Sequence, residues 1–112
     1  MEVSQGEVVL CEFYFSDLKR NKLRPVIVFK NNLPFEDFIG MPISSRLDRL
    51  NDDEILIDQS DFLVGELPKR SKVMVRKTFV ISKQVIVKKY GTLSDAYLHR
   101  LHRAFCLYFQ CN

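Results

Sequence analysis

Short apolar runs separated by polar turns predict a protein built mainly of β-strands. The run over residues 7–15 is rich in β-branched and aromatic side chains, and Gly6 marks its start. A second run, 24–29, contains Pro25, which is expected only near the beginning of a strand. The same criteria predict further short strands at residues 38–45, 54–58, 72–76, 78–81 and 85–87. Because no long helix separates these strands, they indicate a barrel or a sandwich.

Turn and breaker residues divide the runs. Residues 16–23 are predicted to form a polar, basic turn, and residues 31–34 a loop. Gly40 and Pro42 predict a bulge or a sheet edge near the end of the third strand.

The end of the chain follows a helical period instead. Ser94 is a predicted N-cap, Asp95 places an acid in the first turn, and Leu93 is spaced from Leu98 as a hydrophobic staple. Apolar side chains then recur at helical spacing, at Leu98, Leu101, Phe105 and Tyr108. The expected fold class is therefore mainly β, an α+β domain that ends in one amphipathic helix.

Length and composition are those of one globular domain, predicted to span residues 1–112. Hydrophobic residues make up 46% of the chain and charged residues 28%, unlike a disordered sequence. The apolar stretches are far shorter than the roughly 20 residues that span a bilayer, and the first residues are acidic where a signal peptide is basic. We therefore expect a cytoplasmic protein without a membrane span. The three cysteines lack metal-ligand spacing and are expected to be free thiols.

Charge is unevenly distributed, although the net charge of +3 is modest. Residues 19–24 and 69–77 each carry a cluster of cations without an acid, whereas residues 48–61 are acidic. Such clustering suits an anionic polymer, because phosphate contacts supply most non-specific affinity. On charge alone, two solvated loops are the simpler interpretation. The cations are Lys19, Arg20, Lys22 and Arg24 in the first cluster, and Lys69, Arg70, Lys72, Arg76 and Lys77 in the second.

Several familiar catalytic patterns are missing from the sequence. His99 and His102 lie three residues apart on the predicted helix without further ligands at metal-site spacing, so they are expected to be exposed helix residues. The four glycines are isolated, which argues against a glycine-rich phosphate loop. Asp52 and Asp53 lie in the acidic segment and are expected to be solvated, which makes a two-metal nuclease improbable.

One small set of polar residues remains. Arg24 stands at the mouth of the second predicted strand, and Ser44 and Ser45 stand at the end of the third. Taken alone, they are more simply a surface cation and a turn.

The surrounding sequence resembles the MazF/PemK family of toxins in five ordered segments. The first three are Gly6-Glu7-Val8-Val9, Phe13-Tyr14-Phe15-Ser16-Asp17-Leu18 and Lys22-Leu23-Arg24-Pro25-Val26-Ile27-Val28. They are similar to the family's N-terminal signature, in which a loop after an aromatic strand leads to Arg-Pro-Val/Ala-Val. Pro42-Ile43-Ser44-Ser45 resembles the family's Pro-x-Thr/Ser segment, and Gly91-Thr92-Leu93-Ser94 resembles the turn before its last helix.

This resemblance implies a fold and an activity. The fold is a small SH3-like β-barrel, of about six to seven strands with a C-terminal helix, that forms a homodimer. The activity is cleavage of single-stranded RNA without a metal or other cofactor, in which the 2′-hydroxyl attacks the adjacent phosphate. The products are a 2′,3′-cyclic phosphate and a 5′-hydroxyl. A cognate antitoxin would hold the toxin inactive by placing an acidic or amphipathic segment in the same groove.

The resemblance also implies roles for residues of this chain. Arg24 matches the family's catalytic arginine, and Ser44 matches a catalytic threonine, keeping the hydroxyl but not the methyl that stiffens the rotamer. Activity could be weaker for that reason. The expected RNA-binding residues are Ser16, Lys19, Arg20, Lys22, Ser45, Arg46, Arg76 and Lys77.

A rival interpretation keeps the fold without the chemistry. The chain could be a non-catalytic SH3-like module, derived from the same fold, that binds RNA or protein. Cleavage of single-stranded RNA in EDTA to 5′-hydroxyl ends would favour the enzyme, whereas binding without scission would favour the module.

Overall fold

The computed structural model describes residues 1–14 and 21–111 of the chain. Within these residues there are eight strands: β1 (Glu7–Tyr14), β2 (Asn21–Lys30), β3 (Asp37–Ser44), β4 (Glu54–Ile57), β5 (Phe62–Gly65), β6 (Ser71–Met74), β7 (Phe79–Ser82) and β8 (Ile86–Leu93). Short 3-10 helices lie at Pro34–Glu36, Gln59–Asp61, Val75–Lys77 and Lys83–Val85. One α-helix, α1 (Asp95–Phe109), follows β8. The predicted class, mainly β with a C-terminal helix, is confirmed.

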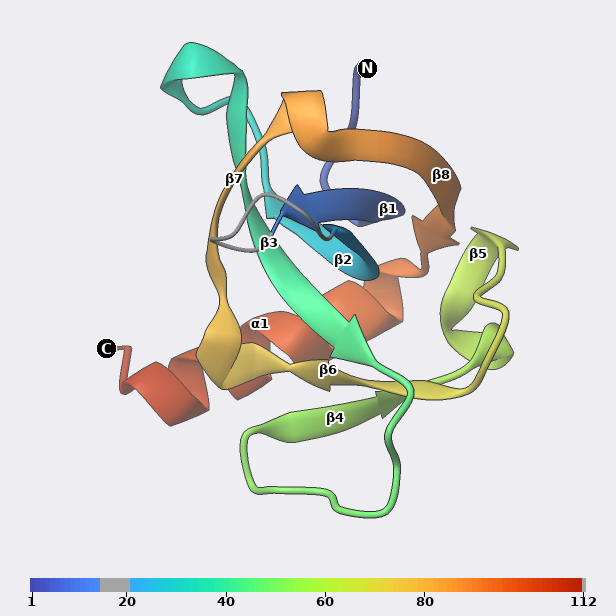
Figure 1. The fold of residues 1–112 in the computed structure, drawn as a ribbon. Coiled ribbons are helices and arrows are strands. Elements are labelled where there is room, and N and C mark those ends of the chain that lie inside the picture. Colours follow the sequence, from blue (N-terminus) through green and yellow to red (C-terminus); the bar gives the residue numbers. More distant parts are fainter. Residues whose placement is uncertain (15–20, 112) are drawn as a thin grey trace.

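The strands form one curled antiparallel sheet. Its order is β4-β6-β3-β2-β1-β8-β5, and β7 also pairs with β3. β3 pairs with three other strands. β2 lies along one of its edges, and β7 followed by β6 lies along the other. The sheet bends round into a half-open barrel, with α1 running along one side (Figure 1).

Two-residue alternation along the strands gives the sheet two differently covered faces. One face packs with α1 in a main core that includes Val8, Ile27, Met41, Ile43, Tyr97 and Leu101. The other face carries a smaller core of Val3, Val9, Cys11, Val26, Val28, Phe38 and Ile81. This second core covers only part of its face, and the rest is open to a groove.

Gly40 lets three strands approach closely inside the second core. A Cβ at this position would lie 2.4 Å from Cγ1 of Val26 and 2.5 Å from Cδ1 of Ile81. The β2–β3 register shifts between Val28 and Lys30, opposite Ile39 and Gly40. This irregularity lies in the first half of β3 and not near its end, where the sequence predicted one.

Two prolines lie inside strands, each where the sheet lacks a neighbour. Pro25 lies in the middle of β2, not near its beginning as the sequence predicted, because β2 begins already at Asn21. At that point β2 pairs only with β1, since its ladder with β3 begins at Val26. On β3, the residues that pair with β7 end at Gly40, and those that pair with β6 begin at Ile43. Pro42 lies between these two stretches, where β3 has no partner on that side. A missing N–H is tolerated at such local edges.

Other boundaries differ from the predictions as well. β5 was not predicted, and β8 is longer than the expected run at 85–87. The predicted strand at 72–76 is shorter, because the chain turns into a 3-10 helix at Val75. Of the predicted turn at 16–23, residues 16–20 lie outside the described part, and the rest belongs to β2.

Helix α1 begins as the sequence predicts. The Oγ of Ser94 accepts a hydrogen bond from the backbone N–H of Tyr97 at 3.2 Å. The helix is too short and too polar to cross a membrane, and no other helix of the described residues is long and apolar enough. All three cysteines are free, as expected.

Candidate functional site

A groove of about 810 Å³ occupies the open part of the second face. It follows the strand alternation, because every second residue of neighbouring strands lines it. The strand residues are Phe13 on β1, Lys22 and Arg24 on β2, Pro42 and Ser44 on β3, Lys72 and Met74 on β6, and Glu54 on β4. Arg46, Asp48 and Arg49 line it from the loop at 45–53, and Lys77 and Phe79 from the chain around β7.

Arg24 and Ser44 occupy matching positions on adjacent strands. The antiparallel β2–β3 ladder ends by pairing Val26 with Pro42. Two residues further along, on the same face, β2 has Arg24 and β3 has Ser44. Both side chains line the groove, so a guanidinium and a hydroxyl border one shared space.

The groove carries an excess of positive charge. Among its described lining residues there are six cations and two carboxylates. This excess suits a polyanion, because each cation that meets a phosphate displaces counterions. The cations are Lys22, Arg24, Arg46, Arg49, Lys72 and Lys77, and the carboxylates are Asp48 and Glu54.

One cation and one carboxylate form a buried ion pair at the base of the groove. Nζ of Lys72 lies 2.9 Å from Oε1 of Glu54, and the two side chains are only 8% and 7% exposed. Burial by itself would raise the pKa of Glu54. Hydrogen bonds from the backbone of Asn51 and from Lys72, together with the charge of Lys72, outweigh it and hold the pKa of Glu54 below its usual range.

Four of the lining residues also border a second cavity, of about 380 Å³. They are Lys22, Arg24, Ser44 and Arg46. The second cavity is also lined by Ser45 and by residues 67–69. Arg24 and Ser44 therefore stand on a ridge between two hollows, where an extended polymer could pass over them.

The structure thus brings together four of the predicted site residues on this ridge: Lys22, Arg24, Ser44 and Arg46. Ser45 lines the second cavity only. Lys77 lies on the groove wall. Arg76 is not among the lining residues; its Nε lies 3.7 Å from Oδ2 of Asp53, and its side chain is largely exposed. Ser16, Lys19 and Arg20 lie outside the described residues.

Sequence reasoning missed two features of the groove. It counted Lys72 as one cation of a cluster, and it did not associate Glu54 with the site. The only signal was a lysine within an apolar strand and an acid opening another, and the sequence does not say that these strands are neighbours. Asp53, expected to be solvated, is instead ion-paired and largely sheltered.

The histidines lie away from this groove. Both are exposed on α1, as predicted, and the ring of His102 lies 4.6 Å from that of Phe29. In the part of the chain that the structure describes, no three His, Cys, Asp or Glu side chains gather as a metal-binding group.

Comparison with known families identifies the chain. A family model described as a PemK-like, MazF-like toxin of type II toxin-antitoxin systems matches residues 4–109. The chain belongs to the PemK/MazF toxin family. The match spans every described strand, α1 and all the groove residues, so the site lies within the family's domain. No curated protein sequence matches the chain.

Several solved structures share the fold of this chain. An endoribonuclease in complex with its cognate antitoxin, from a mycobacterial species, superposes with a TM-score of 0.74 at 16% identity, covering 99% of this chain and 98% of the other. The Mycobacterium tuberculosis toxin MazF-mt6 gives 0.69 at 19% identity, with coverages of 93% and 98%. A further mycobacterial endoribonuclease gives 0.72 at 15% identity, with coverages of 98% and 94%. At these identities the likeness shows a shared fold.

Proposed function

We propose that this PemK/MazF family member is an endoribonuclease toxin that cuts single-stranded RNA without a metal ion. The observation that carries the proposal is the convergence of Arg24 and Ser44 on one ridge of a cationic groove. Two of the structurally similar proteins are described as endoribonucleases, which supports the same activity here.

The proposed chemistry needs a nucleophile that RNA itself carries. The 2′-hydroxyl oxygen attacks the adjacent phosphorus, and the bond from phosphorus to the 5′-oxygen breaks. The proton lost by the 2′-hydroxyl is balanced by the proton gained by the leaving oxygen. The products are a 2′,3′-cyclic phosphate and a 5′-hydroxyl, so single-stranded DNA is bound without being cut.

Arg24 and Ser44 would act on the charge that builds on the phosphate. The planar guanidinium of Arg24 can donate two parallel hydrogen bonds to phosphate oxygens. The hydroxyl of Ser44 would donate a further bond and fix the phosphate in position. Lys22, Arg46 and Lys77 would hold the neighbouring phosphates.

We also propose two protein partners. One is a cognate antitoxin that occupies the groove, in line with the antitoxin complex of the similar endoribonuclease. The other is a second copy of this chain, seated on an apolar face formed by Phe79, Val80, Phe105 and Phe109 around a cavity of about 510 Å³. Phe79 also lines the cationic groove, so a copy on this face would border that groove.

The test is cleavage of a mixed single-stranded RNA in EDTA, followed by analysis of the ends. We expect 5′-hydroxyl ends from the parent and a loss of at least about a hundredfold in rate for Arg24→Ala, the cost of removing one preorganised charge stabiliser. Arg24→Lys should recover little, because an ammonium lacks the planar fork. Arg103→Ala, on the exposed side of α1, is the matched control. RNA bound but left intact by the parent would refute the nuclease and favour the binding module.

A further inference from the structure

The loop at 45–53 between β3 and β4 is tied down at both of its ends and in its middle. At its start, the N–H of Arg46 donates to Oγ of Ser44 at 3.2 Å. At its end, the N–H of Val75 donates to the carbonyl of Asp53 at 3.1 Å, and Arg76 pairs with the Asp53 carboxylate. A loop of this length would otherwise be free to move away from the sheet.

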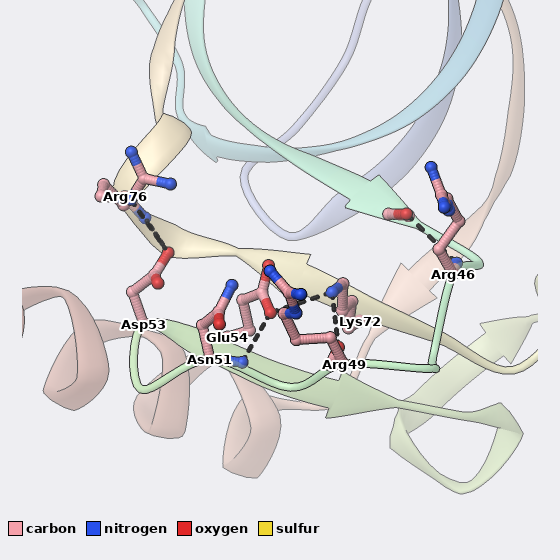
Figure 2. A network of polar contacts seen from close by, with 8 residues as sticks. Arg46, Arg49, Asn51, Asp53, Glu54, Lys72 and Arg76 are labelled. Carbon is pink, nitrogen blue, oxygen red and sulfur yellow. Dashed lines mark hydrogen bonds and ion pairs between the residues drawn. The ribbon is translucent and has the colours of Figure 1, made fainter.

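The Lys72–Glu54 pair supplies the central attachment. Nζ of Lys72 donates to the carbonyl of Arg49 at 2.7 Å as well as to Glu54. Oε1 of Glu54 also accepts from the N–H of Asn51 at 2.8 Å. Figure 2 shows the two side chains meeting between β6 and the loop, with Arg49 and Asn51 on the loop side and the Asp53–Arg76 contact to one side.

The position of Lys72 links this attachment to the ridge. In the antiparallel β3–β6 pair, Lys72 is the direct partner of Ser44, so their side chains are neighbours on the groove face. A lysine here would be expected to reach for RNA. Its ammonium is instead directed at the loop and almost wholly shielded from solvent.

We propose that the Lys72–Glu54 pair is a positioning device that fixes the loop at 45–53 as a wall of the groove, and so determines which bases are accepted beside the scissile phosphate. The proposal rests on the nuclease function proposed above. The loop contributes Arg46, Asp48 and Arg49 to the groove. Asp48 puts an acceptor in an otherwise cationic wall, where it would favour bases with an exocyclic amino group over uracil, which has none.

Removing only one member of the pair would leave a buried, uncompensated charge and could unfold the protein. The informative variant is the double replacement Lys72→Met with Glu54→Leu, because replacing both charges by apolar side chains of similar size is often neutral for stability. It removes the side-chain partners of Arg49 and Asn51 while leaving Arg24, Ser44 and the backbone hydrogen bond from residue 54 to the Asn51 carbonyl in place. Lys83→Met is the matched control, since Lys83 is similarly sheltered, at 12% exposure, and pairs with Glu36 away from the groove.

Two measurements test the device. Hydrogen exchange of the backbone amides at 46–51 should quicken about tenfold in the double variant, the equivalent of one hydrogen bond, while amides of β2 keep the parent rate. With RNAs that differ at one base beside the cut, KM should rise about tenfold and the parent's preference among bases should shrink, with kcat changing less. Lys83→Met should match the parent in both measurements. Unchanged exchange or an unchanged base preference in the double variant would overturn the proposal.

Base preference can also be measured without cleavage. Oligonucleotides that bind the protein are selected from a pool of single-stranded 2′-deoxy sequences, which lack the attacking hydroxyl and are not cut. If the parent binds selectively in this pool but cuts no RNA, the nuclease proposal fails, and the double variant still tests the positioning role. A parent that binds the pool without any base preference contradicts the positioning role itself.

Discussion

Ser44 connects the ridge to the loop at a single oxygen. Its Oγ accepts a hydrogen bond from the N–H of Arg46, which leaves the hydroxyl proton available to another acceptor. The same atom can therefore hold the start of the loop and donate to a phosphate oxygen. A threonine could do both with a more restricted rotamer.

Replacing Ser44 by alanine should lower the rate of RNA cleavage by about tenfold to a hundredfold, because a hydrogen bond to a charged phosphate is worth about 1.5–3 kcal/mol. Ser44→Thr should cut at least as fast as the parent. Single-turnover cleavage of one defined RNA measures both variants. Ser4→Ala is the control for loss of a hydroxyl, since Ser4 is exposed and lines neither cavity. Equal rates for Ser44→Ala and the parent would remove Ser44 from the mechanism.

For single residues, the sequence alone predicts site residues that belong to a motif. It does not predict site residues that are brought together only by the pairing of strands. The segments around Arg24 and Ser44 carry the family resemblance, and both residues lie on the ridge. Lys72 and Glu54 are 18 positions apart. Their pairing becomes visible only when the register of β4 and β6 is known, because the sequence pattern gives alternation within a strand and not its partner.

Elements were predicted well where local signals are strong. The N-cap at Ser94 and the helical period define α1 from a few neighbouring residues. β5 has only four residues, and Leu63 and Val64 within it are exposed, so it shows no alternation. Its place is set by pairing with β8 at the sheet edge, a contact that no local pattern encodes.

Tyr97 fastens α1 to the distant strand β4. Its hydroxyl donates to the carbonyl of Leu56 at 2.7 Å, and the side chain is buried in the main core. Burial, aided by the negative charge of Asp61, raises the pKa of Tyr97, so the phenol keeps its proton throughout the physiological range. By this hydrogen bond α1 helps to hold β4 in place, and Glu54 is the first residue of that strand.

Tyr97→Phe should lower the free energy of unfolding by about 1–3 kcal/mol, since the ring is kept while the buried Leu56 carbonyl loses its donor. Urea unfolding monitored by circular dichroism measures the change. Tyr108→Phe is the control, because Tyr108 lies near the end of the same helix and is 42% exposed. A variant as stable as the parent would show that water replaces the lost donor.

On the scale of the whole molecule, apolar side chains remain uncovered on one side of the domain. The apolar face combines β7 with the last turns of α1, and Val80 on it is 60% exposed. The rings of Phe105 and Phe109 are in contact there, with centroids 4.7 Å apart. Monomeric proteins rarely leave such patches open. In a two-fold dimer each copy would present this same patch to the other.

Val80→Glu should therefore weaken dimerisation by at least about a hundredfold, because a two-fold interface would bury the new charge twice without a partner. Sedimentation velocity over a range of concentrations measures the shift towards monomer. Val64→Glu is the matched control, because Val64 is 63% exposed on β5, away from the apolar face. This variant should keep the parent's mass.

Since Val80 does not line the cationic groove, the monomeric variant also separates assembly from chemistry. If it cuts RNA at the parent's rate, each groove is complete within one chain, whereas a loss of cleavage with the fold intact would mean that the second copy forms part of the working site. A parent that is monomeric at every concentration would leave the apolar face without a second copy to cover it and would refute the homodimer.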